Sequence, residues 1–175
     1  MSVKIIAEVG SVHDGSFGNA IRLVDAAKEC GANTVKFQTH IAEAETIRTA
    51  PPPAYFSSES RFEYFRRTAF TLDQLLRLKS HCSDVGVEFL SSPFSESAVD
   101  MLEQVGMSVY KIPSGEVTNT PLLRKIAPLG KPVLLSSGMN SWFELDQAVE
   151  TIREHHDRIT ILQCTTQYPC VYERV

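Results

Sequence analysis

Short apolar runs alternate with amphipathic segments along most of the chain. Runs of strand length lie at residues 4–9, 34–39, 87–91, 109–112, 132–136 and 159–164. Between them, apolar residues recur at helical spacing over residues 18–30, 72–85, 95–105, 121–129 and 141–155. A period of 3.6 residues is typical of helices that bury one face. The pattern therefore predicts six strands joined by helices.

Capping residues mark several of the predicted helix boundaries, and one interval interrupts the alternation. Thr71 is placed to cap the N-terminus of the helix at 72–85, and Gly106 and Gly130 follow their helices at the C′ position. Residues 41–68 contain three consecutive prolines and five aromatic residues. This interval is too long and too aromatic for a simple connection, so we expect a large loop with a short helix.

The predicted strands are nearly continuous hydrophobic runs, which is typical of parallel strands covered on both faces. Uninterrupted alternation of strands and helices leaves two main α/β architectures, an open doubly wound sheet or a TIM (β/α)₈-type barrel. No GxGxxG loop follows the first strand, which weakens the dinucleotide-binding form of the open sheet. The alternation slightly favours the barrel, with about six βα units in this chain.

Composition narrows the class of protein. Hydrophobic residues make up 43% and charged residues 22%, as in an ordinary globular domain, and the net charge of -4 gives no reason to expect a nucleic-acid partner. No apolar run is long enough to span a membrane and the N-terminus lacks a signal-peptide pattern, so we expect a cytoplasmic protein. The four cysteines form no CxxC pair, which argues against a zinc site or disulfides. Cys164, at the end of the sixth strand, is more simply explained by packing than by a site role.

Polar residues gather where the predicted strands end, which is the edge at which both architectures bind ligands. They are Glu8, Lys36, Gln38, Ser91, Ser92, Lys111, Ser114, Glu116, Ser136, Ser137, Thr165, Thr166 and Tyr168. Ammonium and hydroxyl donors suit an anionic phosphate or carboxylate. Carboxylates beside them could carry protons or bind sugar hydroxyls.

Each of these residues also has an ordinary structural explanation. A single lysine in a strand, such as Lys36 or Lys111, is as often a residue whose head reaches the rim. Glu8 could be the buried partner of one of these lysines and nothing more. We expect His13 and His40 to be hydrogen-bonded loop residues, and the histidines at 81, 155 and 156 to lie on the surface. The predicted site therefore rests on the whole set of polar residues.

Three segments carry a resemblance to a known family. They begin IIAEVGSVHDGSFGN, SSPFSESAVD and LQCTTQYPC, and the second continues through YKIPSGE to KPVLLSSGM. These segments resemble the sialic acid synthases, which make N-acetylneuraminic, legionaminic or pseudaminic acid. The similarity covers nearly the whole chain except the aromatic loop around residues 43–68.

The resemblance implies a TIM barrel that condenses phosphoenolpyruvate with an open-chain N-acetylmannosamine-like amino sugar, giving a nonulosonic acid and phosphate. Within its motifs, the catalytic positions correspond to Glu116, Glu8 and Lys111. The substrate-binding positions correspond to Lys36, Gln38, Ser92, Ser114, Ser136, Thr166 and Tyr168. Val12, Ser92, Ser137 and Thr166 depart from the residues usual in the family, which bears on the substrate more than on the reaction type.

The resemblance also implies a divalent metal, Mn²⁺ or Mg²⁺, that activates the sugar aldehyde in the complete enzyme. Relatives take two metal-binding histidines from later strands, and many add an antifreeze-like domain whose arginine reaches into the partner's site in a homodimer. A full barrel takes ~250 residues, whereas this sequence stops at Val175. We therefore expect no metal ligands in this chain and no condensation by residues 1–175 alone.

Two alternatives stay open from the sequence. One is a degenerate, non-catalytic module that keeps an anion and sugar pocket without the metal site. The other is a different phosphoenolpyruvate-dependent aldol-type synthase, of the kind making seven- or eight-carbon sugar acids. The YKIPSGE and CTxxYP elements argue against the second.

Overall fold

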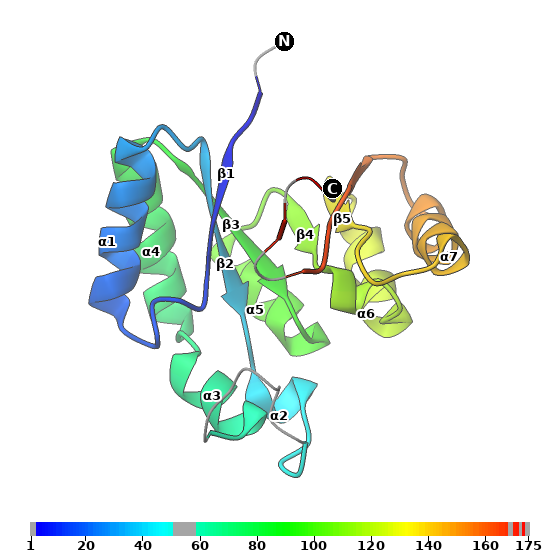
Figure 1. Ribbon diagram of the computed structural model, residues 1–175, viewed down its shortest axis with the longest axis horizontal. Coiled ribbons are helices and arrows are strands. Elements are labelled where there is room, and N and C mark those ends of the chain that lie inside the picture. Colours follow the sequence, from blue (N-terminus) through cyan, green and yellow to red (C-terminus); the bar gives the residue numbers. More distant parts are fainter. Residues whose placement is uncertain (1–2, 51–58, 168–169, 172, 174–175) are drawn as a thin grey trace. The chain divides into compact units, whose positions relative to one another are not determined.

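The computed structural model describes residues 3–50, 59–167, 170–171 and 173, and the chain divides into two compact units, residues 1–107 and 108–175. The first unit contains β1 (Ile6–Gly10), α1 (Phe17–Glu29), β2 (Thr34–Thr39), α2 (Ala42–Glu45), α3 (Arg61–Thr68), α4 (Leu72–Val85), β3 (Glu88–Pro93) and α5 (Glu96–Val105) (Figure 1). The second contains β4 (Tyr110–Ile112), the 3₁₀ turn η1 (Ser114–Glu116), α6 (Thr120–Ile126), the 3₁₀ turn η2 (Ala127–Leu129), β5 (Val133–Ser136), α7 (Trp142–Arg153) and β6 (Ile159–Leu162).

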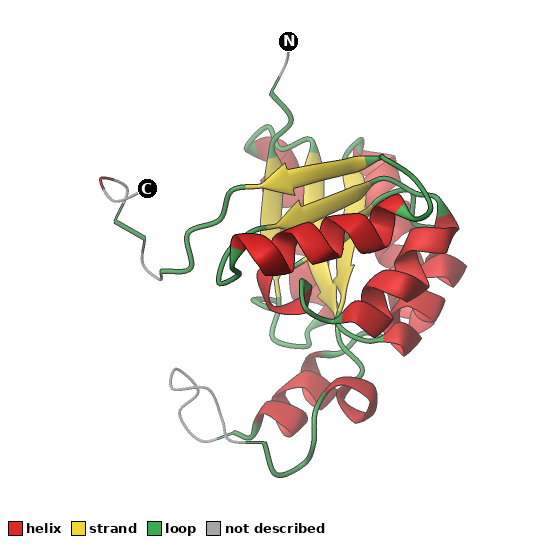
Figure 2. Ribbon diagram, turned by 90° about the vertical axis from the view of Figure 1, so that its right-hand side faces the viewer, coloured by secondary structure: helices red, strands yellow, loops and turns green. Residues whose placement is uncertain are grey.

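The strands that the structure describes pair only in parallel. In the first unit they form a sheet in the order β1-β2-β3, and in the second a sheet in the order β4-β5-β6. Strands and helices alternate through both units. Figure 2 distinguishes the helices (red) from the strands (yellow). Parallel neighbours need a crossover connection, and the intervening helices supply it. The predicted alternation of parallel strands with helices is therefore confirmed, as two runs of three strands.

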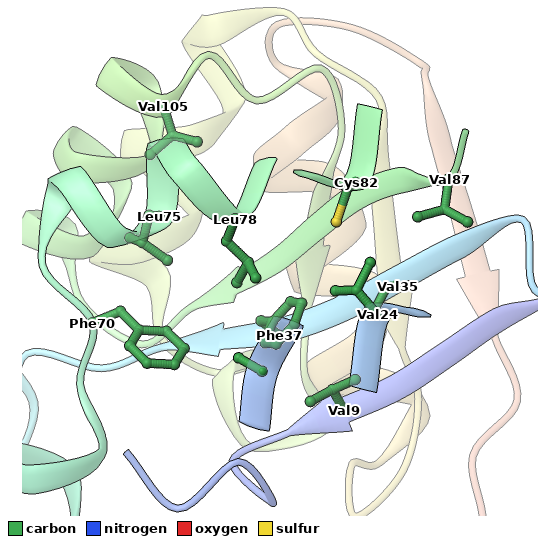
Figure 3. Packing of buried hydrophobic residues seen from close by; sticks show 11 residues of the cluster. Val9, Val24, Val35, Phe37, Phe70, Leu75, Leu78, Cys82, Val87 and Val105 are labelled. Atoms are coloured by element: carbon green, nitrogen blue, oxygen red, sulfur yellow. The ribbon is translucent and has the colours of Figure 1, made fainter. Parts of the chain in front are cut away.

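The core of the first unit lies between its sheet and helices α1 and α4 (Figure 3). Side chains on a strand alternate between faces, so Val35 and Phe37 of β2 point toward these helices and are fully buried. Val24 of α1 and Leu78 of α4 belong to the same buried cluster. Lys36, and the β2 residues two positions before and after it, therefore lie on the opposite face of the strand.

Local capping chemistry sets the helix boundaries as the sequence predicts. The Thr71 hydroxyl accepts from the backbone N–H of Gln74, and the Gln74 side chain accepts from the backbone N–H of Thr71, which forms a capping box. Gly106 ends α5 with φ +81°, a left-handed conformation that glycine adopts without steric cost.

The structure differs most from the sequence prediction in the interval at 41–68 and around the end of α7. The interval at 41–68 holds two helices, α2 and α3, where one short helix was expected; its prolines lie outside the described residues. Helix α7 ends at Arg153, before the predicted end at residue 155. Of the histidines expected on the surface, His155 is exposed, whereas His81 and His156 are half-buried. The His156 Nδ1 accepts from the backbone N–H of Arg158 (3.2 Å). Within the described residues, no helix combines the length and apolar character needed to cross a membrane.

Candidate functional site

In the first unit, strand register brings four of the predicted site residues onto one sheet face. Glu8 of β1 pairs with Lys36 of β2, and Gln38 of β2 pairs with Ser92 of β3. All four are in phase with Lys36, opposite the core face that carries Phe37. The Lys36 ammonium forms an ion pair with Glu8. Its side chain is only 12% exposed while that of Glu8 is 48% exposed, so the pair lies at the rim of this face with the carboxylate toward solvent.

Gln38 and Ser92 differ in how their polar atoms are satisfied. The Gln38 Oε1 accepts from the Ser11 hydroxyl at 3.1 Å and lies 3.2 Å from His40 Nε2. The Ser92 hydroxyl is fully buried and has no hydrogen-bond partner among the described residues. A buried polar group without a partner costs about 1–3 kcal/mol. An oxygen of a bound ligand would supply the missing partner, so Ser92 has the environment of a ligand-facing hydroxyl.

In the second unit, a buried lysine lies in the short strand β4. Lys111 is 7% exposed, and its Nζ donates to the Ile112 carbonyl at 3.0 Å and to the Ser136 hydroxyl at 2.5 Å. The Cys164 thiol also donates to the Ser136 hydroxyl oxygen, at 3.2 Å. With its oxygen accepting twice, Ser136 keeps its own proton to donate. A buried ammonium beside such a hydroxyl is well suited to an anion, because both groups then donate charge-assisted hydrogen bonds.

Gly138 lets three loops of the second unit approach closely. A Cβ at this position would lie 2.7 Å from Thr166 Cγ2, 2.8 Å from Ser114 Oγ and 3.2 Å from Cys164 Cβ. The loop is also tied by Asn140, whose Nδ2 donates to the Ser114 carbonyl at 2.9 Å and to the Gly138 carbonyl. The absence of a side chain at residue 138 thus brings the ends of β4, β5 and β6 together.

Glu116 is half-buried at the end of η1, four residues before the first residue of α6, Thr120. Its Oε2 accepts from Asn119 Nδ2 at 2.7 Å, while Asn119 Oδ1 accepts from the backbone N–H of Leu122 and caps α6. The helix start therefore orients the carboxylate through Asn119. The last predicted site residue, Tyr168, lies outside the described residues.

The structure adds residues that sequence reasoning did not assign to the site. Cys164 was attributed to packing, but it is only partly buried and hydrogen-bonds to Ser136. Its position directly after a strand is the same signal that identified the other candidates. Ser11 and Asn140 act through hydrogen bonds to Gln38 and to the Ser114 backbone, and no pattern in the sequence marks them.

The described side chains do not assemble a metal site. Among residues 3–50, 59–167, 170–171 and 173, no group of three or more His, Cys, Asp or Glu side chains is arranged to hold a metal ion. The donor set of these residues does not fit the divalent metal implied by the resemblance.

Comparisons with known proteins agree with the resemblance carried by the motifs. The model of the NeuB family matches residues 23–175. The chain is 36% identical over 180 residues to the N,N'-diacetyllegionaminic acid synthase of Campylobacter jejuni, covering 98% of this chain and 54% of that protein. It is also 36% identical over 169 residues to the N-acetylneuraminate-9-phosphate synthase of Mus musculus, covering 94% of this chain and 47% of that protein.

A solved structure supports the same assignment. The N-acetylneuraminic acid synthetase of Leptospira borgpetersenii, in complex with citrate, superposes with a TM-score of 0.86 at 28% identity and covers 99% of this chain and 58% of its own. The chain spans about half the length of the curated relatives it matches. Since the family model covers most of its residues and the relatives exceed a third in identity, the chain belongs to the NeuB family.

Proposed function

We propose that the protein carrying this chain condenses phosphoenolpyruvate with an N-acetylmannosamine-like amino sugar, giving a nonulosonic acid and phosphate. The observation that carries the proposal is the buried Lys111 ammonium held against the Ser136 hydroxyl, a pair of donors suited to a phosphate or carboxylate. The names of the relatives, synthases of legionaminic acid and of N-acetylneuraminate 9-phosphate, support the choice of reaction.

The reaction balances without an oxidant or reductant. C3 of phosphoenolpyruvate forms a bond to the aldehyde carbon of the open-chain sugar, and the aldehyde oxygen takes a proton to become a hydroxyl. Water adds at C2, and phosphate leaves from the same carbon. In this scheme Lys111, Ser114 and Ser136 of the second unit bind phosphoenolpyruvate. Ser92 belongs to the proposed substrate-binding residues of the first unit. Glu116 carries a proton at the reacting carbons, a role worth roughly 10²–10⁴ in rate.

The sugar is assigned to the face of the first unit that carries Glu8, Lys36 and Gln38. An ammonium, a carboxylate and an amide offer both donors and acceptors, as a chain of hydroxyls and an acylamino group requires. The half-exposed Glu8 carboxylate can accept from sugar hydroxyls without leaving Lys36. Thr166, exposed at the end of β6, and Tyr168 complete the proposed substrate-binding set.

The remaining expectations belong to the same proposal. Residues 1–175 would form part of a (β/α)₈ barrel, in which strand ends meet at one rim. The complete enzyme would add the later strands, the antifreeze-like domain and the Mn²⁺ or Mg²⁺ ligands. It would act in the cytoplasm as a homodimer on small-molecule substrates.

A phosphate-release assay on the full-length protein, meaning this chain with any further residues that its gene encodes, tests the proposal. The assay supplies phosphoenolpyruvate, Mn²⁺ and a panel of N-acylated hexoses. Loss of a charge-assisted hydrogen bond costs about 1.5–3 kcal/mol, so Lys111→Ala should raise the KM for phosphoenolpyruvate at least tenfold or abolish turnover. Lys4→Ala, which removes only an exposed ion pair with Glu88, is the matched control and should leave both constants unchanged. Absence of sugar-dependent phosphate release from the unmodified protein would refute the proposal.

A further inference from the structure

A buried His–Glu pair lies behind the proposed sugar-binding residue Gln38. His40 Nδ1 is 2.8 Å from Glu45 Oε1, and the two side chains are only 3% and 5% exposed. The second carboxylate oxygen, Oε2, accepts from the backbone N–H of Ile41 at 3.3 Å. Helix α2, which supplies Glu45, is thereby tied to the end of β2, and the carboxylate is fixed in front of the ring.

Two aromatic rings hold the His40 imidazole in one orientation. Phe65 of α3 stacks on it at 4.0 Å between ring centroids and an interplanar angle of 7°, and Phe94, after β3, stacks at 4.2 Å and 25°. Rotating the imidazole would break both stacks and the bond to Glu45. The ring therefore points its Nε2 steadily at the Gln38 amide, 3.2 Å from Oε1.

The contacts of the ring set the direction of its hydrogen bond to Gln38. Nδ1 faces a carboxylate oxygen of Glu45 and Nε2 faces the amide oxygen of Gln38, and an amide oxygen only accepts. Nε2 is therefore the nitrogen that donates to Gln38, while Glu45 holds the opposite side of the ring.

The contacts of Oε1 leave the NH₂ end of the Gln38 amide facing the ligand. Oε1 is occupied by His40 and by the Ser11 hydroxyl, which leaves the NH₂ group on the other side. A Cβ placed on Gly10 would lie 3.2 Å from Glu8 Oε1 and 3.8 Å from Gln38 Nε2, so the amide nitrogen is on the Glu8 side. A ring without a proton on Nε2 would present a lone pair to Oε1, and the amide would turn over to present its oxygen instead.

We infer that His40 and Glu45 are positioning residues that hold the Gln38 NH₂ group toward the amino sugar, where it donates to a sugar oxygen. This assignment rests on the proposed function for the identity of the ligand. Neither residue touches the substrate; both act through Gln38. The pair makes Gln38 a donor, so the sugar presents a hydroxyl or acyl carbonyl oxygen at this position.

The first test is the ¹⁵N spectrum of the imidazole nitrogens in the full-length protein, with the His40 signals assigned from a His40→Gln sample. The His40 Nε2 signal should show the shift of a nitrogen that carries a proton. Glu45→Ala, which removes the partner of Nδ1, should change the His40 signals. Glu43→Ala, which removes an exposed side chain two residues away on the same helix, is the matched control and should leave the signals in place. A His40 Nε2 without a proton in the unmodified protein overturns the inference, and this measurement needs neither activity nor a stable variant.

The second test is the split between kinetic constants. One hydrogen bond between neutral groups contributes about 0.5–1.5 kcal/mol, so Glu45→Ala should raise the KM for N-acetylmannosamine roughly threefold to tenfold. The KM for phosphoenolpyruvate should stay the same, as should both constants in Glu43→Ala. A sugar KM that is unchanged in Glu45→Ala would remove the positioning role. No condensation by the unmodified protein would instead refute the proposed function, and with it the sugar assigned to Gln38.

Discussion

Gly138→Ala is a test of how tightly the strand ends of the second unit must approach one another. Gly138 has no positive φ, so alanine meets no backbone penalty and the effect isolates crowding. The new methyl group would lie 2.7 Å from Thr166 Cγ2 and 2.8 Å from Ser114 Oγ, both closer than real Cβ contacts. Those side chains can rotate, but Cys164 Cβ, at 3.2 Å, moves only with its backbone.

The magnitude follows from these contacts. Overpacking by one methyl group typically costs 1–3 kcal/mol, and we expect the lower half of that range, about 1–2 kcal/mol, because two of the three neighbours can rotate away. Displacing the Ser114 hydroxyl from its ligand should add a loss of about 0.5–1.5 kcal/mol in binding. The variant should therefore unfold at lower denaturant and show a KM for phosphoenolpyruvate raised about twofold to tenfold.

Denaturant unfolding and steady-state kinetics of the full-length protein measure both effects. Gly18→Ala is the matched control, since a Cβ there meets nothing within 4 Å and the residue lies in α1. Alanine should stabilise this helix by roughly 0.5–1 kcal/mol and leave the kinetics unchanged. A Gly138→Ala protein with the stability and kinetics of the unmodified one would show that the strand ends tolerate the methyl group, and the reasoning would fail.

Three further predictions concern single side chains. Glu116→Gln should lower kcat by roughly 10²–10⁴ in a folded protein that still binds phosphoenolpyruvate; a variant with most of its kcat would exclude a proton-carrying role. The buried His13 ring accepts a hydrogen bond from the Gly15 N–H, and its pKa is lowered, first by burial. Because the unfolded chain then binds more protons, the free energy of unfolding should fall as pH drops below about 6.5, and His13→Gln should flatten that slope in denaturant titrations from pH 7.5 to 5. Burial raises the pKa of the Cys82 thiol to about 12, so at pH 8 iodoacetamide should modify the exposed Cys30 and spare Cys82, as read by mass spectrometry; equal labelling in folded protein would contradict the burial.

Much of the fold can be predicted from local sequence signals. Strand and helix positions follow from the period of apolar residues, which depends only on backbone geometry. Thr71 and Gly106 fix their helix ends through contacts within a few residues, so their roles could be read directly. The placement of polar residues at strand ends also follows from the alternation, because in parallel sheets these ends share one edge.

The pairings within the candidate site required tertiary structure. Glu8 meets Lys36 because the register of β1 against β2 places them side by side, and periodicity cannot supply a register between strands. Cys164 reaches Ser136 because parallel β5 and β6 bring their ends together across a separation of 28 residues. From the sequence alone, the position of Cys164 after the sixth strand was compatible with both core packing and a role in the site.

His40 gives the most detailed example of what the sequence predicts and what only the tertiary structure determines. Its sequence position predicts a hydrogen-bonded loop histidine, and the structure confirms that. Which partners it has depends on α2, α3 and the loop after β3, segments up to 54 residues away that supply Glu45, Phe65 and Phe94. The period of apolar residues predicts whether a residue faces the core, because the buried face of a helix or strand can be identified from that element alone. The protonation and direction of a polar group depend on atoms from several elements at once, and only the folded chain brings those atoms together.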